Sequence, residues 1–343
     1  GSKGAILLLD PASTADAIAG RLKDAGATIV EGSDPVLLPK ARKNATELAG
    51  TRRAHIRDGA AMVRFLCWLD EIGPTGTIDE IAAAEKLTWF RADTAKKDGS
   101  ELIDLSFDTI SGAGPNGAIV HYRVTPATTR TIAPDMLYLT DSGAQYRDGT
   151  TDITRTVVVG KPSDEMRDRF TRVLKGMMAI ATARFPVGAS GAQLDTLARQ
   201  WLWQAGLDFD HGTGHGVGAF LGVHEGPQRI AKPRGSQAGT DQPLMAGMIL
   251  SNEPGYYKAN EYGIRIENLV LVEKREIPGG EGEWLGFETL TFAPIDRTLV
   301  DRSLLSPAEI EWWNSYHAKV RDVLAPQMEG EALAWLEEAC KPL

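Results

Sequence analysis

The chain has 343 residues, of which 43% are hydrophobic and 24% are charged, and its formal net charge is −9. This length accommodates one large domain or two smaller ones, and the acidic balance argues against a nucleic-acid-binding protein. No run approaches the roughly 18 apolar residues of a membrane helix, and no signal peptide opens the sequence. The two cysteines, Cys67 and Cys340, are too far apart in sequence to indicate a disulfide framework. We therefore expect a cytoplasmic protein with no nucleic-acid or membrane partner.

Residues 4–34 predict a strand, a helix and a second strand. The apolar runs "GAILLLD" and "ATIVEGS" flank "STADAIAGRLKDAG", a helical pattern that ends at Gly26. Three elements cannot cover both faces of a parallel sheet. We therefore assign residues 1–39 to the remnant of an upstream α/β domain and residues 40–343 to a second domain.

The second domain begins with two helices, predicted over about 44–73 and 77–95. Each starts with a polar residue followed three positions later by a glutamate, which is the pattern of a capping box. Residues 103–159 then alternate β-branched and polar residues, as in "AIVHYRVT" and "TTDITRTVVV", and predict strands. The capping pairs are Asn44 with Glu47 and Thr77 with Glu80.

The same order of elements then repeats. Helices are predicted over about 163–185 and 190–206, and strands with glycine-rich loops over 209–293. This order predicts an α+β domain of two related halves, although no residue-level repeat is visible. A helical tail over 306–340 follows, with Ser306, Pro307 and Glu309 as its start. Its tryptophans, Trp312, Trp313 and Trp335, either complete the core or support self-association as a homodimer.

The stretch "HGTGHGVG", residues 211–218, places His211 and His215 four positions apart. A helical zinc clamp would need a glutamate directly after the first histidine, and four glycines in eight residues make a helix improbable on propensity. Glycine instead lets the backbone approach another chain or a ligand closely. Taken alone, the two histidines fit hydrogen-bonded loop residues as well as ligands.

Acidic residues stand in apolar, strand-like sequence at four places. Asp141 lies in "LYLTDSG" and Asp152 in "TTDITRTVVV", although aspartate is depleted in strands. A two-residue turn at Asp148-Gly149 would pair residue 141 with residue 156 and leave Asp152 about 13 Å along the strand. If both aspartates bind one site, the connection must be longer or bulged, bringing residue 141 nearly opposite residue 152.

Glu253 in "MILSNEPGYY" and Glu267 in "YGIRIENLVLV" are similarly placed. Each is either exposed at a sheet edge or bound to something, because unpaired acids are almost never buried. Two halves that meet face to face would gather these acids with a histidine in one cleft. Four crowded carboxylates repel one another unless they are protonated or neutralised. Two divalent cations would neutralise them, and an oxygen-rich set with one imidazole suits Mn²⁺, with Co²⁺, Zn²⁺ or Fe²⁺ as alternatives.

These residues resemble the ligands of a known family. The order Asp141, Asp152, His215, Glu253 and Glu267 is similar to the five-ligand dinuclear site of the "pita-bread" metallopeptidases, which include methionine aminopeptidase, prolidase, Xaa-Pro aminopeptidase and creatinase. The stretches "DLSFDTISGAGPNGAIVHY", "HGTGHGVGAFLGVHEGP", "NEPGYY" and "GIRIENLVLV" most resemble the three-domain form of Xaa-Pro aminopeptidase, over roughly residues 40–340. The resemblance implies a pita-bread fold of two pseudo-symmetric halves, with the N-terminal domain and most of the middle domain lying outside this sequence.

The resemblance also implies roles for individual residues. Asp152 and Glu267 would bridge two metal ions, Asp141 would bind one of them, and His215 and Glu253 the other. Glu253 would also take a proton from a metal-bridging hydroxide or water as it attacks the substrate. The remaining positions fall into two groups: His121 and His224 would assist catalysis, and Phe107, His211, Tyr257 and Arg265 would line the pocket for the proline ring.

The implied activity is hydrolysis of the N-terminal Xaa-Pro bond of peptides whose second residue is proline. Two alternatives stay open: a prolidase that cleaves Xaa-Pro dipeptides, and a non-catalytic peptide-binding protein on the same fold. Such binding relatives have lost their ligands, whereas all five ligand types are present here. Methionine aminopeptidase is a less suitable match, because the C-terminal helices and the sequence "HGTGHGVG" of residues 211–218 fit that enzyme poorly.

Overall fold

The computed structural model describes residues 4–233 and 240–343, and the chain divides into two compact units, Gly1–Lys40 and Ala41–Leu343. The expectations for residues 1–3 and for residues 234–239 of the predicted strand region lie outside the described residues. None of the described helices is long and apolar enough to span a membrane.

The first unit is the βαβ element that the sequence predicts. Strands β1 (Ile6–Leu9) and β2 (Thr28–Glu31) pair in parallel, and α1 (Asp16–Asp24) connects them. Apolar side chains of this unit face solvent: Ile6 is 73% exposed, and α1 buries none of its residues. The interpretation of residues 1–39 as a domain remnant stays a prediction.

The second unit begins with a long helix whose start was predicted correctly. In α3 (Ala45–Ile72), the Asn44 side chain accepts the backbone N–H of Glu47, and the Glu47 carboxylate accepts the N–H of Asn44. This is the predicted capping box. A short helix, α2 (Leu37–Ala41), precedes it at the boundary between the units.

The start of α4 (Glu80–Lys97) differs from the prediction. Asp79 is the N-cap rather than Thr77, and its carboxylate accepts the N–H of Ala82. Glu80 points into the interior, where its carboxylate accepts the side-chain N–H₂ of Asn116 at 2.9 Å. The predicted capping box fails because this acid has donors in the core, which the local sequence does not show.

The strands of the first half form two small antiparallel sheets. Strands β4 (Ile110–Ala113), β5 (Met136–Ser142) and β8 (Ile153–Val159) make one sheet. The predicted register is wrong by two residues, since Asp141 pairs with Thr154 and not with residue 156. The cause is the turn, which lies at residues 147–148. The other sheet contains β3 (Asp104–Leu105), β6 (Ala144–Tyr146) and β7 (Gly149–Thr150).

The second half repeats the order of two helices followed by strands. Helix α5 (Asp164–Ala181) is shorter than predicted, because Arg184–Pro186 form β9 and pair with β16 (Trp284–Thr289) at the edge of a sheet. Helix α6 (Gly191–Trp203) starts with the predicted capping box at Ser190. The remaining strands are β10 (Gly214–His215), β11 (Arg229–Ile230), β12 (Ile249–Asn252), β13 (Gly255–Lys258), β14 (Tyr262–Arg265) and β15 (Asn268–Arg275).

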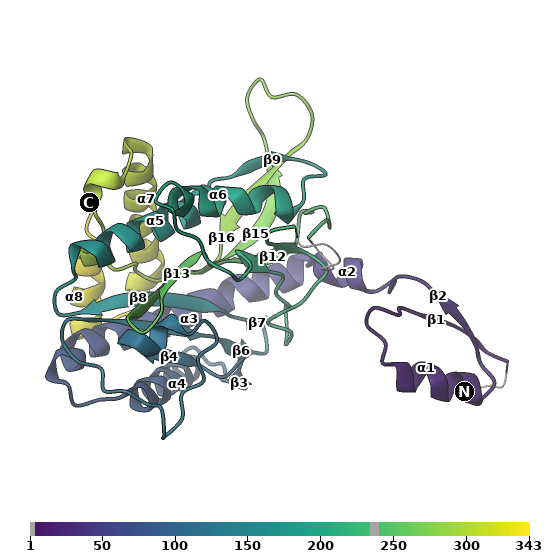
Figure 1. Ribbon diagram of the computed structural model, residues 1–343, viewed down its shortest axis with the longest axis horizontal. Coiled ribbons are helices and arrows are strands. Elements are labelled where there is room, and N and C mark those ends of the chain that lie inside the picture. The colour runs from purple at the N-terminus through teal and green to yellow at the C-terminus, as the bar shows by residue number, and fades with distance from the viewer. Residues whose placement is uncertain (1–3, 234–239) are drawn as a thin grey trace. The chain divides into compact units, whose positions relative to one another are not determined.

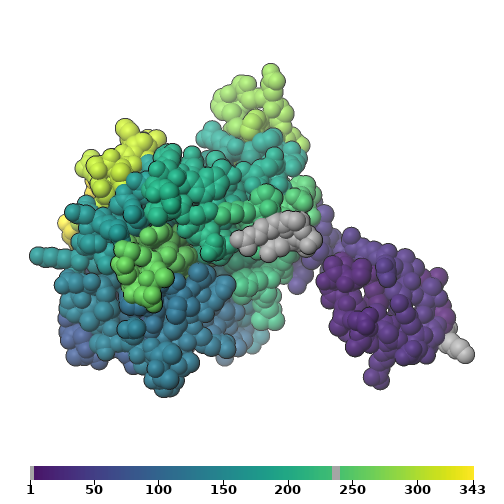
Figure 2. Space-filling view, viewed as in Figure 1, coloured from purple at the N-terminus to yellow at the C-terminus, as the bar shows by residue number. Residues whose placement is uncertain are grey.

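Helices cover the strands of the second unit on two sides. In the view of Figure 1, α5 and α6 lie above β13, and α3 and α4 lie below it. The connection between β15 and β16 projects from the body of this unit (Figure 2). The sheet β12-β15-β16-β9 belongs to the second half, and β4-β5-β8 to the first. The predicted α+β class and the order of two related halves are confirmed.

The C-terminal helices α7 (Pro307–Leu324) and α8 (Gly330–Ala339) close the main core. The predicted start of α7 is confirmed by a capping box at Ser306. Trp313 is fully buried in the largest apolar cluster, whereas Trp312 and Trp335 pack at its edge. Trp313 therefore completes the core. The predicted self-association stays a prediction that sedimentation at several concentrations would test.

Candidate metal centre

A cavity of about 580 Å³ lies among the strands of both halves, and all five predicted metal ligands line it. Strand β5 and the residue before β8 supply two of them from the first half. The second half supplies the other three from β10, from the end of β12 and from the link between β14 and β15. In chain order these ligands are Asp141, Asp152, His215, Glu253 and Glu267.

The ligand atoms of these residues lie close together. Asp152, His215 and Glu267 each offer one ligand atom, and these atoms lie within 4.8 Å of one another. The His215 Nε2 atom is 3.5 Å from Asp152 Oδ2 and also 3.5 Å from Glu253 Oε1. Asp141 joins the group through the Arg265 guanidinium, which is 2.6 Å from Asp141 Oδ2. The fold thus brings together candidate ligands that are up to 126 positions apart in the sequence, from Asp141 to Glu267.

The orientation of His215 leaves one ring nitrogen available as a ligand. Its Nδ1 atom lies 3.0 Å from the carbonyl oxygen of Gly216. A carbonyl only accepts hydrogen bonds, so Nδ1 carries a proton and donates to it, while Nε2 faces the carboxylates. This arrangement of one ring nitrogen donating to a backbone carbonyl is common for metal-binding histidines.

Two residues with side-chain hydroxyls, neither of them predicted from the sequence, donate hydrogen bonds to the glutamates. The Thr154 hydroxyl donates to Glu267 Oε2 at 2.7 Å, and the Ser251 hydroxyl donates to Glu253 Oε1 at 3.1 Å. Ser251 also accepts the backbone N–H of His215 at 2.9 Å. Short polar residues next to predicted ligands were the only signal in the sequence, and that signal is too common to use alone.

The carboxylates have strongly perturbed protonation. Burial, followed by the charges of Asp141 and Glu253, raises the pKa of Asp152 well above its ordinary value. Burial and the charge of Asp152 likewise raise the pKa of Glu267, and burial raises that of Glu253. Such crowding costs free energy in the absence of positive charge.

The donor set fits divalent cations. One oxygen atom each of Asp141, Asp152 and Glu267 is buried and receives no hydrogen bond from the described residues. Buried carboxylate oxygens normally have a donor or bind a metal. Four carboxylates and one imidazole form the oxygen-rich set preferred by Mn²⁺ and tolerated by other divalent transition metals.

A chain of hydrogen bonds forms one wall of the cavity. The His211 Nδ1 atom lies 2.8 Å from the carbonyl of Gly212, so its Nε2 accepts from the Tyr257 hydroxyl at 2.8 Å. Tyr257 in turn accepts from Arg265 Nη1 at 2.5 Å. Burial and the charge of Arg265 lower the pKa of His211 to about 3. His211 is therefore neutral, and both its nitrogens are engaged.

The predicted substrate residues occupy two positions. Phe107, His211 and Arg265 line the cavity, and their contact with the proline ring stays a prediction. Tyr257 is not among the lining residues, and its hydroxyl instead stands behind His211 and Arg265. Its hydroxyl thus contacts both of those side chains, and its role in binding the proline ring stays a prediction.

The two histidines predicted to assist catalysis also line the cavity. The ring of His224 packs edge-on against that of His215, with centroids 4.2 Å apart. Burial, followed by the charge of His215, lowers the pKa of His224 to about 4. His121 is exposed at the cavity's edge.

Close contacts within the protein explain the two glycines that flank His215. A Cβ atom on Gly214 would lie 2.0 Å from the carbonyl oxygen of Ser251, and one on Gly216 would lie 2.0 Å from that of Glu225. No side chain fits at such distances. The glycines therefore allow strand β10 to lie against β12 and against the loop that carries His224.

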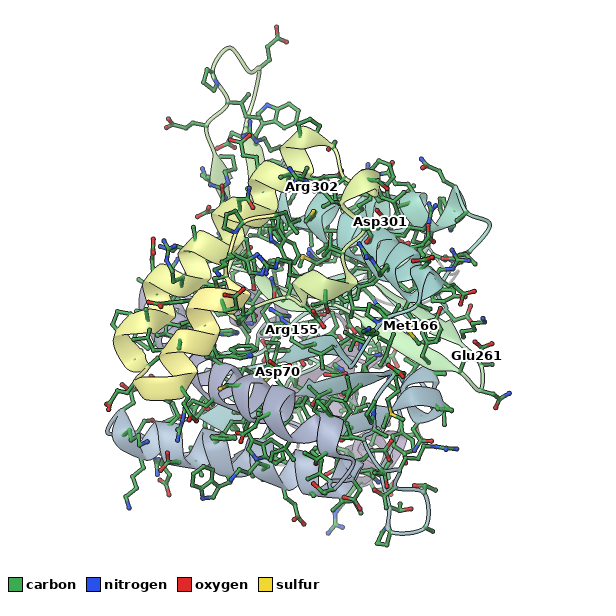
Figure 3. All side chains as sticks on the ribbon, turned by 90° about the vertical axis from the view of Figure 1, so that its left-hand side faces the viewer. Asp70, Arg155, Met166, Glu261, Asp301 and Arg302 are labelled. Atoms are coloured by element: carbon green, nitrogen blue, oxygen red, sulfur yellow. The ribbon has the colours of Figure 1, made fainter. Side chains whose placement is uncertain are left out.

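The buried side chain of Arg155 holds the backbone next to the candidate metal ligands. The Arg155 guanidinium donates to the carbonyls of Thr154 and Glu267 at 2.9 and 2.6 Å, and to the hydroxyl of Tyr316 at 3.0 Å. Figure 3 shows Arg155 beside the C-terminal helices, to which Tyr316 belongs. Arg155 thus ties the backbone of a predicted ligand to α7. No pattern in the sequence indicates this contact.

With this geometry established, comparison with known proteins shows the family. Residues 49–274 match metallopeptidase family M24, and residues 283–343 match the C-terminal region of peptidase M24. The first match alone covers more than half of the chain. The chain therefore belongs to metallopeptidase family M24, and the resemblance proposed from the sequence is confirmed.

Individual relatives agree with this assignment. A probable Xaa-Pro aminopeptidase P of Laccaria bicolor is 49% identical over 98% of this chain and 52% of its own length. Aminopeptidase P2 of Arabidopsis thaliana is 49% identical over 90% of this chain and 43% of its own length. The chain thus spans about half the length of the curated relatives it matches.

Solved structures confirm the pita-bread fold. The X-prolyl aminopeptidase of Caenorhabditis elegans, described as a cytosolic enzyme with a di-nuclear active site, superposes with a TM-score of 0.86 at 40% identity, over 98% of this chain and 54% of that one. The Xaa-Pro dipeptidase of Bacillus anthracis gives a TM-score of 0.69 at 26% identity, over 85% of this chain and 74% of that one.

Proposed function

We propose that this chain is the catalytic part of a dinuclear metal-dependent aminopeptidase, which hydrolyses the N-terminal bond of peptides with proline at the second position. The observation that carries the proposal is the convergence of four carboxylates and one imidazole in a single cavity. The di-nuclear site described for the C. elegans relative supports it. The description of that relative as cytosolic likewise supports a cytoplasmic location.

The residues present would hold two divalent cations. Asp152 and Glu267 would bridge them, Asp141 would complete one site, and His215 and Glu253 the other. The oxygen-rich donor set favours Mn²⁺ over Zn²⁺ or Co²⁺. When bound, such cations polarise the scissile carbonyl and lower the pKa of water, so that it can attack at neutral pH.

The chain's own residues would move protons and bind the intermediate. Burial raises the pKa of Glu253, so its carboxylate can accept a proton more readily than an ordinary glutamate. His224 is neutral near pH 7, because its pKa is about 4. A neutral imidazole donates one hydrogen bond without adding a buried charge, and His224 with His121 would donate to the oxygen that becomes negative.

Recognition of proline would depend on shape. The Xaa-Pro bond has no N–H on its nitrogen, so a site must recognise the ring itself. Phe107 and His211 supply apolar and aromatic surface in the cavity. Both nitrogens of His211 are already bonded, which leaves its ring face for contact with the substrate.

Two other functions remain as alternatives. Prolidase shares the fold, as the B. anthracis dipeptidase shows, but cleaves dipeptides. A non-catalytic peptide-binding protein would use the same cavity. The presence of all the predicted ligands favours an enzyme, because a binding protein has no need of crowded acids.

One assay separates these functions. The protein is loaded with Mn²⁺ and incubated with Ala-Pro-Leu and, separately, with Ala-Pro. We expect release of alanine from the tripeptide. Hydrolysis of the dipeptide alone would assign a prolidase, and binding of the tripeptide without hydrolysis would assign a binding protein. Treatment with a chelator should abolish hydrolysis, and added Mn²⁺ should restore it.

A further inference from the structure

The cavity is lined by four cationic side chains, and three of them already have acidic partners. Their ammonium or guanidinium nitrogens lie within 2.6 Å of a carboxylate oxygen. Arg229 is different: its side chain makes no ion pair or hydrogen bond with any residue in the described part of the chain. The three pairs are Arg199 with Asp195, Lys232 with Asp208, and Arg265 with Asp141.

The position of Arg229 places this cation beside the predicted centre. Strand β11 pairs with β10 so that Arg229 lies directly opposite His215. Directly opposed residues of antiparallel strands project from the same face. A Cβ atom on Gly212 would lie 3.6 Å from Arg229 Nη2, so the guanidinium reaches the neighbour of His211. Arg229 therefore lies between a metal-ligand residue and the wall proposed to contact the proline ring.

The guanidinium of Arg229 is placed to bind an anion. Its Nε atom is buried and has no acceptor among residues 4–233 and 240–343, although buried N–H groups are almost always satisfied. Guanidinium groups bind carboxylates through paired, charge-assisted hydrogen bonds. Four acids of this cavity are the predicted metal ligands, and Glu225 is paired with Lys43. The remaining acid, Asp210, forms no ion pair with Arg229 in the described part of the chain, so we expect the acceptor to come from the ligand. A peptide always carries one anion, its C-terminal carboxylate.

We propose that Arg229 binds the C-terminal carboxylate of a short peptide substrate. The cavity of about 580 Å³ has the size that holds a compact ligand, so only a short peptide brings its carboxylate inside. The preferred substrates are then peptides of a few residues, with proline second and a free C-terminus. This inference rests on the proposed function and adds a substrate class to it.

The test compares Ala-Pro-Leu with its C-terminal amide. For the Mn²⁺-loaded protein we expect kcat/KM to be about tenfold or more higher for the acid, the ratio that one charge-assisted hydrogen bond provides. In Arg229→Met the ratio of acid to amide should fall to near one. Arg229→Lys should keep part of the preference. Lys232→Met is the matched control: it removes a cavity cation that Asp208 already holds, and it should keep the wild-type ratio.

Failure of this inference is distinguishable from failure of the proposed function. If the wild type cleaves both peptides with equal kcat/KM, the role of Arg229 is wrong and the aminopeptidase stands. If it cleaves neither, calorimetric binding of Pro-Leu and of its amide decides. Tighter binding of the acid in the wild type, lost in Arg229→Met, supports the carboxylate site. Equal binding of the two ligands overturns it.

Discussion

Asp152 is the residue at which burial and repulsion between carboxylates act together most clearly. It is 3% exposed, its neighbours include two further acids, and the Asp152 Oδ1 atom has no hydrogen-bond donor among the described residues. Such a group lowers the stability of the metal-free protein and raises the affinity for cations, because the same repulsion that opposes folding is removed on binding.

We predict that Asp152→Ala abolishes activity and metal retention without unfolding the protein. Mn²⁺ at a hundred times its dissociation constant should raise the free energy of unfolding of the wild type by about 2.7 kcal/mol, and should not do so in the variant. The measurements are metal content after dialysis and thermal unfolding with and without Mn²⁺. Asp322→Ala, at an exposed acid of α7, is the control. Near-normal turnover of Asp152→Ala would refute its bridging role.

The convergence of the five candidate ligands could be predicted from the sequence, but the residues that support them could not. Asp141 and Asp152 stood out because strands disfavour aspartate. Thr154 and Ser251 carry no such signal, since their roles depend on the strand register, which the sequence analysis placed two residues away. Arg229 became informative only when its neighbours showed that it lacked an acid.

The starts of the helices were predicted correctly from the local sequence wherever no residue of the core competed for the capping side chain. The boxes at Asn44, Ser190 and Ser306 formed as predicted. The predicted box at Thr77 failed because the core binds Glu80 more effectively than the helix end does. The predicted end of α5 failed for a similar reason, since β9 pairs with a strand about a hundred residues later. The predictions of these two helix boundaries were therefore wrong because tertiary contacts, which the local sequence does not show, determine where the helices begin and end.

Helix α7 contains a titratable group that links its packing to pH. His317 is fully buried, its Nδ1 atom bonds the Trp313 carbonyl, and its Nε2 atom accepts the N–H of Ile295 at 3.1 Å. Burial lowers its pKa to about 4. The unfolded chain therefore takes up a proton near pH 6.5 that the folded protein refuses until about pH 4.

We predict that acidification destabilises the protein partly through His317. Between pH 6.5 and pH 4 the unfolded state binds more protons than the folded state. The free energy of unfolding therefore decreases as the pH is lowered through this range, and His317 accounts for about 3 kcal/mol of the decrease. His317→Gln should remove that part of the slope. Urea unfolding at several pH values measures it, and His55, which is also buried, is unchanged in both proteins. An identical slope in the variant would contradict the assignment.

At the scale of the whole molecule, one buried ion pair joins the beginning of the second unit to the centre. Lys43 Nζ lies 2.7 Å from Glu225 Oε1, across 182 positions of sequence. The backbone N–H of Glu225 donates to the Gly216 carbonyl at 2.8 Å, which is also the acceptor for the His215 ring. The pair therefore holds the loop of His224 and the orientation of His215 together.

We predict that Lys43→Met lowers both stability and turnover. Removing one partner of a buried pair costs about 3–5 kcal/mol, and the loosened loop should reduce kcat more than it changes KM. Lys43→Arg should restore part of both. The matched control is Lys175→Met, which breaks a pair with the same 2.7 Å distance, to Glu309 on α7. Urea unfolding and kcat per bound metal are the measurements. Equal losses of kcat in both variants would show that the Lys43 pair has no special connection to the site.

The acceptors around Arg155 come from segments that leave the ribosome at different times. Thr154 is translated beside it, Glu267 and Asn268 much later, and Tyr316 later still. Domains form during synthesis from the N-terminal side onward, yet a nascent chain that stops before Ala293 and Pro294 leaves part of this guanidinium without acceptors. The backbone carbonyls of Thr154 and Glu267 therefore gain the complete support of Arg155 only late in synthesis, and α7 adds the contact with Tyr316 last.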